Sequence, residues 1–361
     1  MKRCPTCGTE YAEEAKYCTR DGARLVAAKP LRASYSPDWR TMTAEPEAGG
    51  SDSLRTTVPV STDLVGQVLD GHYKITRKLG EGGMSFVYLA EDDQGGEKYA
   101  VKVLSPALSQ DKNAMARLRR EADLGGRLAH RNICHIIRVG ETTAGRVYIV
   151  MPYIEGELLA DRTHREGQLS PEETAHWVRD IAAGLQCAHD LGIVHRDLKP
   201  ENVMIAKQPP AEDRAVVMDF GLAKERKASP ALEKLTATGI VLGTPEFMSP
   251  EQLRGKPLDG RSDVYSLALM TYEMLTGKLP FPGRTQQEMM INRLRSDPTP
   301  LRAMRPDIPF NEEIERVLTK GMAREPNGRY ATAPAFADAL DAAVRGEGET
   351  GGGMIGRLFG R

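Results

Sequence analysis

The stretch GIVHRDLKPENVMI, residues 192–205, places a histidine, two basic residues and three polar acceptors between two apolar runs. A solvated charged segment would not need apolar flanks on both sides. A buried strand would not accommodate the charges, because burying an unpaired charge is strongly unfavourable. The pattern therefore predicts a loop held rigidly between packed elements, which is where functional residues are commonly found.

The composition of the whole chain sets outer bounds on its class. With 361 residues the chain is long enough for about two domains. Apolar residues make up 40% and charged residues 27%, as in soluble globular proteins, and the formal charge of −1 gives no reason to expect a nucleic acid partner. No apolar stretch reaches the roughly 18 residues that span a bilayer. We therefore expect a cytoplasmic protein without a transmembrane anchor, and its cysteines are expected to be reduced.

The pattern along the chain changes three times. Residues 1–26 contain three of the five cysteines. Residues 27–65 are rich in Pro, Ser and Thr and show no hydrophobic period, which predicts a disordered linker. Residues 66–345 are strongly patterned, and residues 346–361 form a glycine-rich tail that we expect to be flexible.

The long patterned segment begins with predicted strands and continues with predicted helices. Its strand candidates are β-branched and partly alternating, at residues 75–80, 85–92, 98–104 and 146–154. Helices are expected after residue 170, where Ser170 and Pro171 offer an N-cap and a first helical residue. A β-rich front and an α-rich back predict an α+β fold with two lobes, joined near residues 152–157.

Two features of the predicted strands suit a phosphate ligand. Residues 80–87, GEGGMSFV, lie between two strands, and glycines there let backbone N–H groups approach a phosphate. The alternative is an ordinary hairpin turn. Lys102 ends the strand pattern that follows, and Glu121, on a predicted helix, is a candidate to hold it. Taken alone, Lys102 and Glu121 would be read as solvated residues.

Four polar residues further along the chain have side chains that suit the remaining steps of one reaction. Asn202 and Asp219 are oxygen ligands suited to Mg²⁺ beside phosphates. Asp197 can accept a proton from a hydroxyl group, and Lys199 can neutralise a phosphoryl group in transit. In this order, these residues match transfer of the γ-phosphoryl group of ATP to an alcohol.

Residues 73–341 resemble a eukaryotic-type protein kinase domain of the Ser/Thr kind found in bacteria, with its main motifs in order. The resemblance implies the bilobal protein kinase fold, ATP with Mg²⁺ or Mn²⁺ as cofactors, protein substrates, and a role in bacterial signalling. Catalytic roles are implied for Asp197, Lys199, Asn202, Lys102 and Glu121. Nucleotide contacts are implied for Gly80, Glu81, Gly82, Gly83, Met84, Ser85, Val87, Ala100, Lys102, Met151, Pro152, Ile154, Asn202 and Asp219.

The resemblance also assigns supporting roles. Ser249-Pro250-Glu251 is similar to the A-P-E motif of the family, and Arg329 to the buried arginine that pairs with its glutamate. Asp263 resembles the aspartate that braces the catalytic loop. In the hinge, the Pro152 carbonyl and the Ile154 N–H group are expected to read adenine, although many family members have Glu in place of Pro152. Ser85 departs from the family too, since it replaces a common third glycine.

The resemblance also implies which hydroxyl groups accept the phosphoryl group and how phosphorylation switches the kinase on. D-L-K-P-E-N is the Ser/Thr form of the catalytic loop, so the acceptor is expected to be a Ser or Thr hydroxyl. Thr236 and Thr238 lie where the family carries phosphorylated activation-loop threonines, so the protein is expected to be a phosphoprotein. A phosphate there would face Arg196 and Lys224.

The cysteines at the amino terminus suggest a small metal-bound module. Cys4 and Cys7, followed by Cys18 and Asp21, resemble a zinc ribbon whose last thiolate is replaced by a carboxylate. We expect it to bind Zn²⁺ and to serve in regulation or in binding a partner protein. A degraded, metal-free ribbon and a redox-active thiol pair are the alternatives.

Two other functional classes fit parts of the sequence. A pseudokinase scaffold would act by binding partners, but pseudokinases typically lack the equivalents of Lys102, Asp197 or Asp219, which are all present. A small-molecule kinase is disfavoured by the long segment between Asp219 and Ser249, which resembles a peptide support. The sequence therefore favours an active protein kinase.

Overall fold

The computed structural model describes residues 64–82, 85–92, 96–109, 115, 128–207, 212–220 and 245–346, together with three short strands near the amino terminus. The chain divides into two units, residues 1–64 and 65–361. No helix within the described ranges is both long and apolar enough to cross a membrane.

The first unit contains a small antiparallel sheet. Its strands β1 (Lys2–Arg3), β2 (Glu10–Tyr11) and β3 (Val26–Ala27) pair in the order β2-β1-β3. The predicted zinc ligands Cys4, Cys7, Cys18 and Asp21 lie outside the described residues. The zinc ribbon therefore stays a prediction.

A six-stranded antiparallel sheet opens the second unit. Its strands are β4 (Val68–Leu69), β5 (Tyr73–Gly82), β6 (Ser85–Asp92), β7 (Lys98–Leu104), β8 (Arg138–Glu141) and β9 (Val147–Pro152). They pair in the order β4-β5-β6-β7-β9-β8. The β-branched runs in the sequence thus form strands as predicted, and a four-residue helix, α1 (Pro106–Ser109), follows β7.

The sheet is curled so that its two edges approach each other. β4 and β8 lie at opposite edges, yet Arg138 of β8 forms an ion pair with Asp70, which directly follows β4, at 2.6 Å. The strand interior is fully buried at Val101, Val103 and Ile149. The apolar interior of this curled sheet supplies a rigid frame for the residues on β5, β6 and β7.

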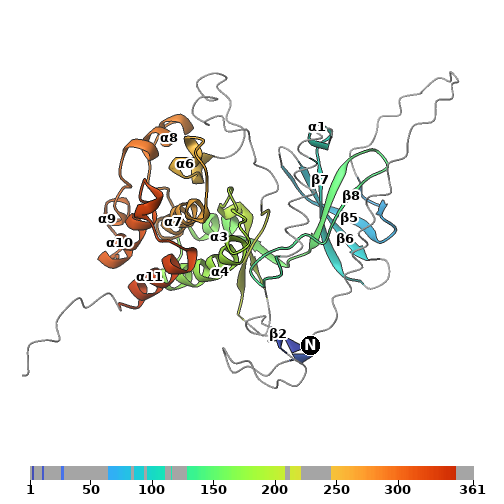
Figure 1. The fold of residues 1–361 in the computed structure, drawn as a ribbon, viewed down its shortest axis with the longest axis horizontal. Coiled ribbons are helices and arrows are strands. Elements are labelled where there is room, and N and C mark those ends of the chain that lie inside the picture. Colours follow the sequence, from blue (N-terminus) through green and yellow to red (C-terminus); the bar gives the residue numbers. More distant parts are fainter. Residues whose placement is uncertain are drawn as a thin grey trace, which may run out of the picture. The chain divides into compact units, whose positions relative to one another are not determined.

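The rest of the second unit is mainly helical. Its α-helices are α3 (Leu159–Glu166), α4 (Pro171–His189), α6 (Pro250–Leu253), α7 (Gly260–Thr276), α8 (Gln286–Arg295), α9 (Leu301–Met304), α10 (Glu312–Gly321) and α11 (Ala333–Arg345). Short 3₁₀ turns lie at η2 (Pro200–Asn202), η3 (Pro245–Phe247) and η4 (Pro326–Gly328). In Figure 1 the strands of the large sheet, blue to green, form one group and the helices, green to red, form another.

The helix beginning at Pro171 starts where the sequence predicts. The Ser170 hydroxyl accepts a hydrogen bond from the N–H group of Glu173 at 3.1 Å, which satisfies one of the free donors of the first turn. Farther along, Val178, Ile181 and Leu185 are fully buried and pack in one apolar cluster with α7. The 3.6-residue spacing of these side chains explains why α4 forms and which face it buries.

A small sheet joins the helical part to the catalytic stretch. β10 (Gly156–Leu158), β11 (Val203–Ala206) and β12 (Arg214–Val217) pair antiparallel in that order. β9 ends and β10 begins within residues 152–157, so the predicted lobe junction is confirmed. The α+β, bilobal architecture expected from the sequence is therefore present.

Strand β12, which ends two residues before Asp219, is anchored to the segment before β8. Val217 donates from its N–H group to the Asn132 carbonyl at 2.9 Å and accepts at its own carbonyl from the Cys134 N–H group at 2.9 Å. The Asn132 side chain donates to the Ala215 carbonyl at 2.8 Å. These hydrogen bonds fix the position of the carboxyl end of β12, and with it the position of Asp219.

Candidate active site

Asp263, on α7, binds the backbone of the catalytic loop at its turn. Its side chain is 1% exposed, and its two oxygens accept from the N–H groups of His195 and Arg196 at 2.8 and 3.0 Å. Arg196 has φ +66°, a left-handed backbone conformation that non-glycine residues seldom adopt. Two hydrogen bonds to one buried carboxylate stabilise that strained turn, so the bracing role expected for Asp263 is confirmed.

His195 joins the catalytic loop to the segment that carries Asp219. Its Nδ1 accepts from the Asp197 N–H group at 3.2 Å, so its Nε2 carries the proton and donates to the Met218 carbonyl at 2.8 Å. The ring meets Phe220 edge-on, with centroids 4.7 Å apart. These contacts explain why a histidine stands here, since His195 joins the two loops through both of its ring nitrogens.

Asp197, Lys199 and Asn202 come together on the loop as the motif predicts. The Lys199 ammonium lies 3.7 Å from Asp197 Oδ2. Asn202 donates from its amide nitrogen to the Asp197 carbonyl at 2.7 Å, which fixes the orientation of its side chain. Because the nitrogen is engaged, the amide oxygen of Asn202 is the atom left to face a cation.

Lys102, on β7, pairs with Asp219 across the two lobes. Its Nζ donates to Asp219 Oδ2 at 2.7 Å, and both side chains are partly buried. Asp219 has φ +58°, and the preceding N–H group, of Met218, donates to the Asn202 carbonyl at 2.8 Å. The structure thus brings Lys102, Asp219 and Asn202 to one place, whereas Glu121 lies outside the described residues.

The glycine-rich stretch lies where β5 ends and the antiparallel β6 begins. Gly80 pairs with Val87 and Gly82 with Ser85, while Gly83 and Met84 lie outside the described residues. A Cβ at Gly80 would meet no atom within 4 Å, and neither glycine has a positive φ. Neither internal crowding nor backbone conformation therefore requires glycine there. Bare backbone instead leaves room for a phosphate, and the neighbouring Glu81 is exposed and pairs with Lys78.

The predicted hinge lies at the end of β9. Ala100 of β7 and Met151 of β9 are direct cross-strand partners, so their side chains share one face of the sheet. β9 ends at Pro152, and the N–H group of Tyr153 donates to the Lys98 carbonyl at 3.2 Å. The Pro152 carbonyl and Ile154 thus belong to the segment that leaves the sheet, as a hinge requires.

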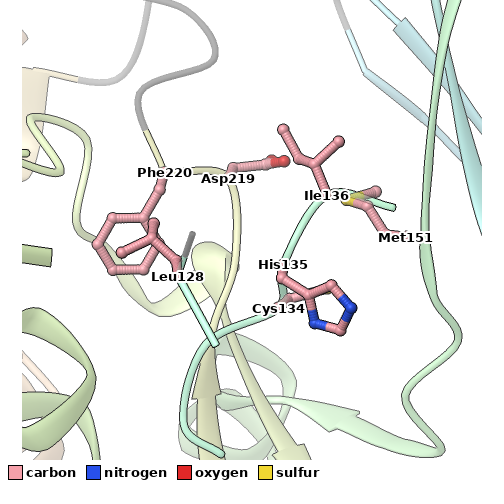
Figure 2. A pocket seen from close by; sticks show the side chains of 7 residues that line it. All are labelled: Leu128, Cys134, His135, Ile136, Met151, Asp219 and Phe220. Carbon is pink, nitrogen blue, oxygen red and sulfur yellow. The ribbon is translucent and has the colours of Figure 1, made fainter. Parts of the chain in front are cut away.

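A small pocket separates the hinge from the segment at Asp219. Its lining residues are Leu128, Cys134, His135, Ile136, Met151, Asp219 and Phe220 (Figure 2). Burial raises the pKa of the Cys134 thiol to about 12, and the Asp219 charge adds to this effect. Burial also lowers the pKa of His135. Burial therefore favours the neutral forms of the thiol and the imidazole.

A buried ion pair fixes the start of α6. Glu251 accepts two hydrogen bonds from the Arg329 guanidinium, both at 2.7 Å, and a third from the Ser262 hydroxyl at 2.7 Å. Burial by itself raises the pKa of Glu251, but the bonds and charge of Arg329 outweigh burial and lower it. The pairing expected from the sequence is confirmed, and its bidentate geometry is the strong form of such a pair.

Gln252 is a structural residue that the sequence analysis did not single out. Its side-chain NH₂ donates to the Arg196 carbonyl at 2.7 Å, and its side-chain oxygen accepts from the Ser249 N–H group at 2.9 Å. Ser249 and Gln252 form a capping box, so the spacing S-x-x-Q was the available signal. The bond to Arg196 joins α6 to the catalytic loop next to Asp197.

Known proteins share this arrangement. The family model described as "Protein kinase domain" matches residues 73–340. The chain is 35% identical over 284 residues to the serine/threonine-protein kinase pkn3 of Myxococcus xanthus, covering 79% of this chain and 52% of pkn3. It is 39% identical over 268 residues to PknB of Mycobacterium tuberculosis, covering 73% of this chain and 42% of PknB. The chain thus spans about half the length of these curated relatives.

Solved structures of other proteins have the same fold as this chain. The kinase domain of Mycobacterium tuberculosis PknI superposes with a TM-score of 0.60 at 28% identity, covering 77% of this chain and 98% of PknI's domain. Rad53 in complex with AMP-PNP gives a TM-score of 0.61 at 26% identity, covering 75% of this chain and 65% of that one. The bilobal fold, the catalytic loop on Asp263 and the matched residues 73–340 lead to one conclusion: the chain belongs to the protein kinase family.

Proposed function

We propose that the chain is an ATP-dependent serine/threonine protein kinase of bacterial signalling, with residues 66–345 as its kinase domain. One observation carries the proposal. Lys102 from β7, Asp219 from the end of β12, and the Asp197–Asn202 loop meet at one place, although they are far apart in the sequence. A scaffold that only binds partners would not require this convergence of a cation, two carboxylates and an amide.

The donor set fits a nucleotide with a divalent cation. Asp219 and the amide oxygen of Asn202 are the hard oxygen ligands that Mg²⁺ or Mn²⁺ takes beside phosphates. The bare backbone at Gly80 and Gly82 gives room for those phosphates, and Lys102 supplies a cation to the same place. When bound, the metal ion neutralises charge that develops on the transferred phosphoryl group.

The remaining steps are assigned to residues of the catalytic loop. Asp197 would accept a hydrogen bond from the acceptor hydroxyl and orient it toward the γ-phosphoryl group. Lys199, whose ammonium lies 3.7 Å from the Asp197 carboxylate, would stabilise negative charge on the phosphoryl group in transit. Lysine two positions after the aspartate supports Ser or Thr as the acceptor.

The adenine ring is proposed to lie against the hinge. Small Ala100 and flexible Met151 face each other on β7 and β9, which leaves an apolar surface for a flat ring. The Pro152 carbonyl and the Ile154 N–H group would then read its edge. Val87, on β6 opposite Lys102, would cover it from the strand after the glycine hairpin.

A phosphorylation switch is proposed for the segment between Asp219 and Ser249. Thr236 and Thr238 are the candidate sites, and Arg196 and Lys224 the candidate cations that a phosphate would engage. Support comes from Arg196 itself, whose backbone is held between Asp263 and Gln252 next to the catalytic aspartate. A phosphate bound by Arg196 would therefore act directly on the catalytic loop.

A zinc-bound regulatory module is proposed for residues 1–26, with Cys4, Cys7, Cys18 and Asp21 as ligands. We expect about one Zn²⁺ per chain by elemental analysis of protein purified without chelator. The metal should be lost in Cys4→Ser and held more tightly in Asp21→Cys, because a thiolate is a softer ligand than a carboxylate. Absence of zinc from the wild-type protein would contradict the proposal.

Transfer of labelled γ-phosphate tests the kinase function. The full chain, ATP and Mg²⁺ are incubated with three peptide pools that differ only in carrying Ser, Thr or Tyr. Label should enter the Ser and Thr pools, and Asp197→Asn should abolish the transfer while its thermal midpoint stays close to that of the wild type. Tight ATP binding without transfer to any pool or to the chain itself would favour the scaffold instead.

A further inference from the structure

Arg293, on α8, is a cation placed almost entirely inside the protein. It is 1% exposed, and its guanidinium lies 5.8 Å from the centroid of the Phe281 ring. Burial lowers its pKa, but an arginine stays protonated in proteins. Within the part of the chain that the structure describes, no carboxylate forms an ion pair with Arg293.

Backbone carbonyls accept hydrogen bonds from both terminal nitrogens of this buried guanidinium. Nη1 of Arg293 donates to the carbonyls of Pro245 and Met248 at 2.7 and 3.1 Å, and Nη2 donates to the carbonyl of Glu246. The carbonyl between them, of Phe247, accepts from the Ser266 hydroxyl of α7 at 2.8 Å. Every carbonyl from residue 245 to residue 248 is therefore held by a side chain of another helix.

The segment so held borders the catalytic loop. It runs directly into α6, whose Gln252 donates to the Arg196 carbonyl next to Asp197. The charges of Glu246 and of Glu201, which lies in the catalytic loop, both help to raise the pKa of Glu273 on α7. Residues 245–248 therefore lead into a helix that is bonded to the loop carrying Asp197, where an acceptor peptide would bind.

We propose that Arg293 is a positioning residue for the protein substrate, which fixes the main chain of residues 245–248 as a preformed surface beside Asp197. This rests on the proposed protein kinase function. One planar guanidinium donates hydrogen bonds to three carbonyls, which restricts the backbone conformation of the segment. An incoming peptide then need not order the segment on binding, and preorganisation of this kind strengthens binding. Among the described residues, the hydrogen bonds and ring contact of Arg293 go to none of those proposed to bind the nucleotide, so its effect should be confined to the peptide.

The test compares Arg293→Lys and Arg293→Met with two controls on the same helix. Lysine keeps the charge, but its single ammonium group cannot reproduce the fork that reaches three carbonyls. Arg295→Met removes an exposed arginine two residues further on. Met290→Ala loosens the cluster of Met290, Met248 and Leu253 without removing a donor.

We expect both Arg293 variants to raise the peptide KM roughly 10-fold, while the KM for ATP and the slow hydrolysis of ATP without peptide stay unchanged. Arg295→Met should leave every parameter unchanged. Met290→Ala should lower the thermal midpoint without a selective change in peptide KM. This pattern would separate positioning from a general loss of stability.

Two outcomes would overturn the inference alone. One is a parallel fall of peptide phosphorylation and ATP hydrolysis in Arg293→Lys, which would mean only a smaller folded fraction. The other is an equal rise of peptide KM in Met290→Ala and Arg293→Lys. A wild-type protein that hydrolyses ATP but phosphorylates no Ser or Thr peptide would overturn the proposed function as well.

Discussion

Lys102 and Asp219 form a 2.7 Å ion pair although 117 positions of sequence separate them. The lysine comes from the curled sheet and the aspartate follows β12, so the pair links the two lobes where we propose that the phosphates bind. Both side chains retain some solvent contact, at 18% and 27% exposure. Ion pairs that keep solvent contact typically contribute about 1 kcal/mol to stability, so we expect the position of this pair to matter more for function than for folding.

Lys102→Met should therefore abolish phosphate transfer and leave the fold intact. Loss of a cation aimed at the reacting phosphates should lower kcat by roughly 10²–10³-fold or more, whereas the thermal midpoint should change little. Autophosphorylation and differential scanning calorimetry measure the two quantities. Lys98→Met, which removes an exposed lysine from the same strand, is the matched control and should retain full activity. Substantial activity in Lys102→Met would contradict the assigned role.

Asp263→Ala should impair both stability and turnover. It leaves the N–H groups of His195 and Arg196 without their acceptors, and each unsatisfied buried donor costs about 1–3 kcal/mol. The strained backbone at Arg196 would also lose its support, so kcat should fall further than the folded fraction explains. Kinetics normalised to the folded fraction, measured by nucleotide binding and calorimetry, test this.

Asp259→Ala is the control for the Asp263 variant. Asp259 caps α7 by accepting from the Arg261 N–H group at 2.9 Å, and loss of such a cap costs about 1 kcal/mol. Asp259 makes no contact with the catalytic loop among the described residues. A fall in normalised kcat as large in Asp259→Ala as in Asp263→Ala would rule out a specific bracing role.

Glu273, on α7, should make stability depend on pH. Burial, followed by the nearby charges of Glu201 and Glu246, raises its pKa to about 7 from an ordinary 4.5. Between these values the unfolded state has lost the proton while the folded state still holds it. The free energy of unfolding is therefore highest below about pH 4.5, where Glu273 is uncharged in both states. It falls as the pH rises through about 7, where the folded state must bury a charge.

Glu273→Gln should remove this dependence. Its free energy of unfolding should match that of the wild type near pH 4 and exceed it by about 1–3 kcal/mol at pH 8, because the glutamine carries no charge to bury. Urea denaturation at several pH values measures the difference. Glu141→Gln, at an exposed position of β8, is the control. A difference between Glu273→Gln and wild type that stays constant from pH 5 to pH 8 would refute the pKa shift.

Thr236→Ala combined with Thr238→Ala should block activation. Each phosphate–arginine hydrogen bond is worth about 1.5–3 kcal/mol, enough to order a loop against Arg196. Phosphatase-treated wild type should start slowly on an exogenous peptide and accelerate with ATP, whereas the double variant should stay slow. Full activity of the double variant from the first minute would exclude the switch.

Some features of this protein follow from the sequence alone, because they depend on residues that are neighbours in the chain. The helix cap at Ser170, the strands at residues 85–92 and 98–104, and the compact motif at residues 195–202 are encoded by spacing over a few positions. Side-chain periodicity and local hydrogen bonding operate over that distance. The bilobal fold and the kinase motifs could therefore be predicted.

Other features depend on how distant elements pack. The pairing of Lys102 with Asp219, the bond from Gln252 to the Arg196 carbonyl, and the curl closed by Arg138 and Asp70 join residues far apart in sequence. Arg293 is the clearest case, since on α8 it reads as one more basic residue in NRLR, yet it is buried on three carbonyls. Whether an arginine faces water or a carbonyl is decided by which element packs over it, and only the tertiary structure of this chain determines that.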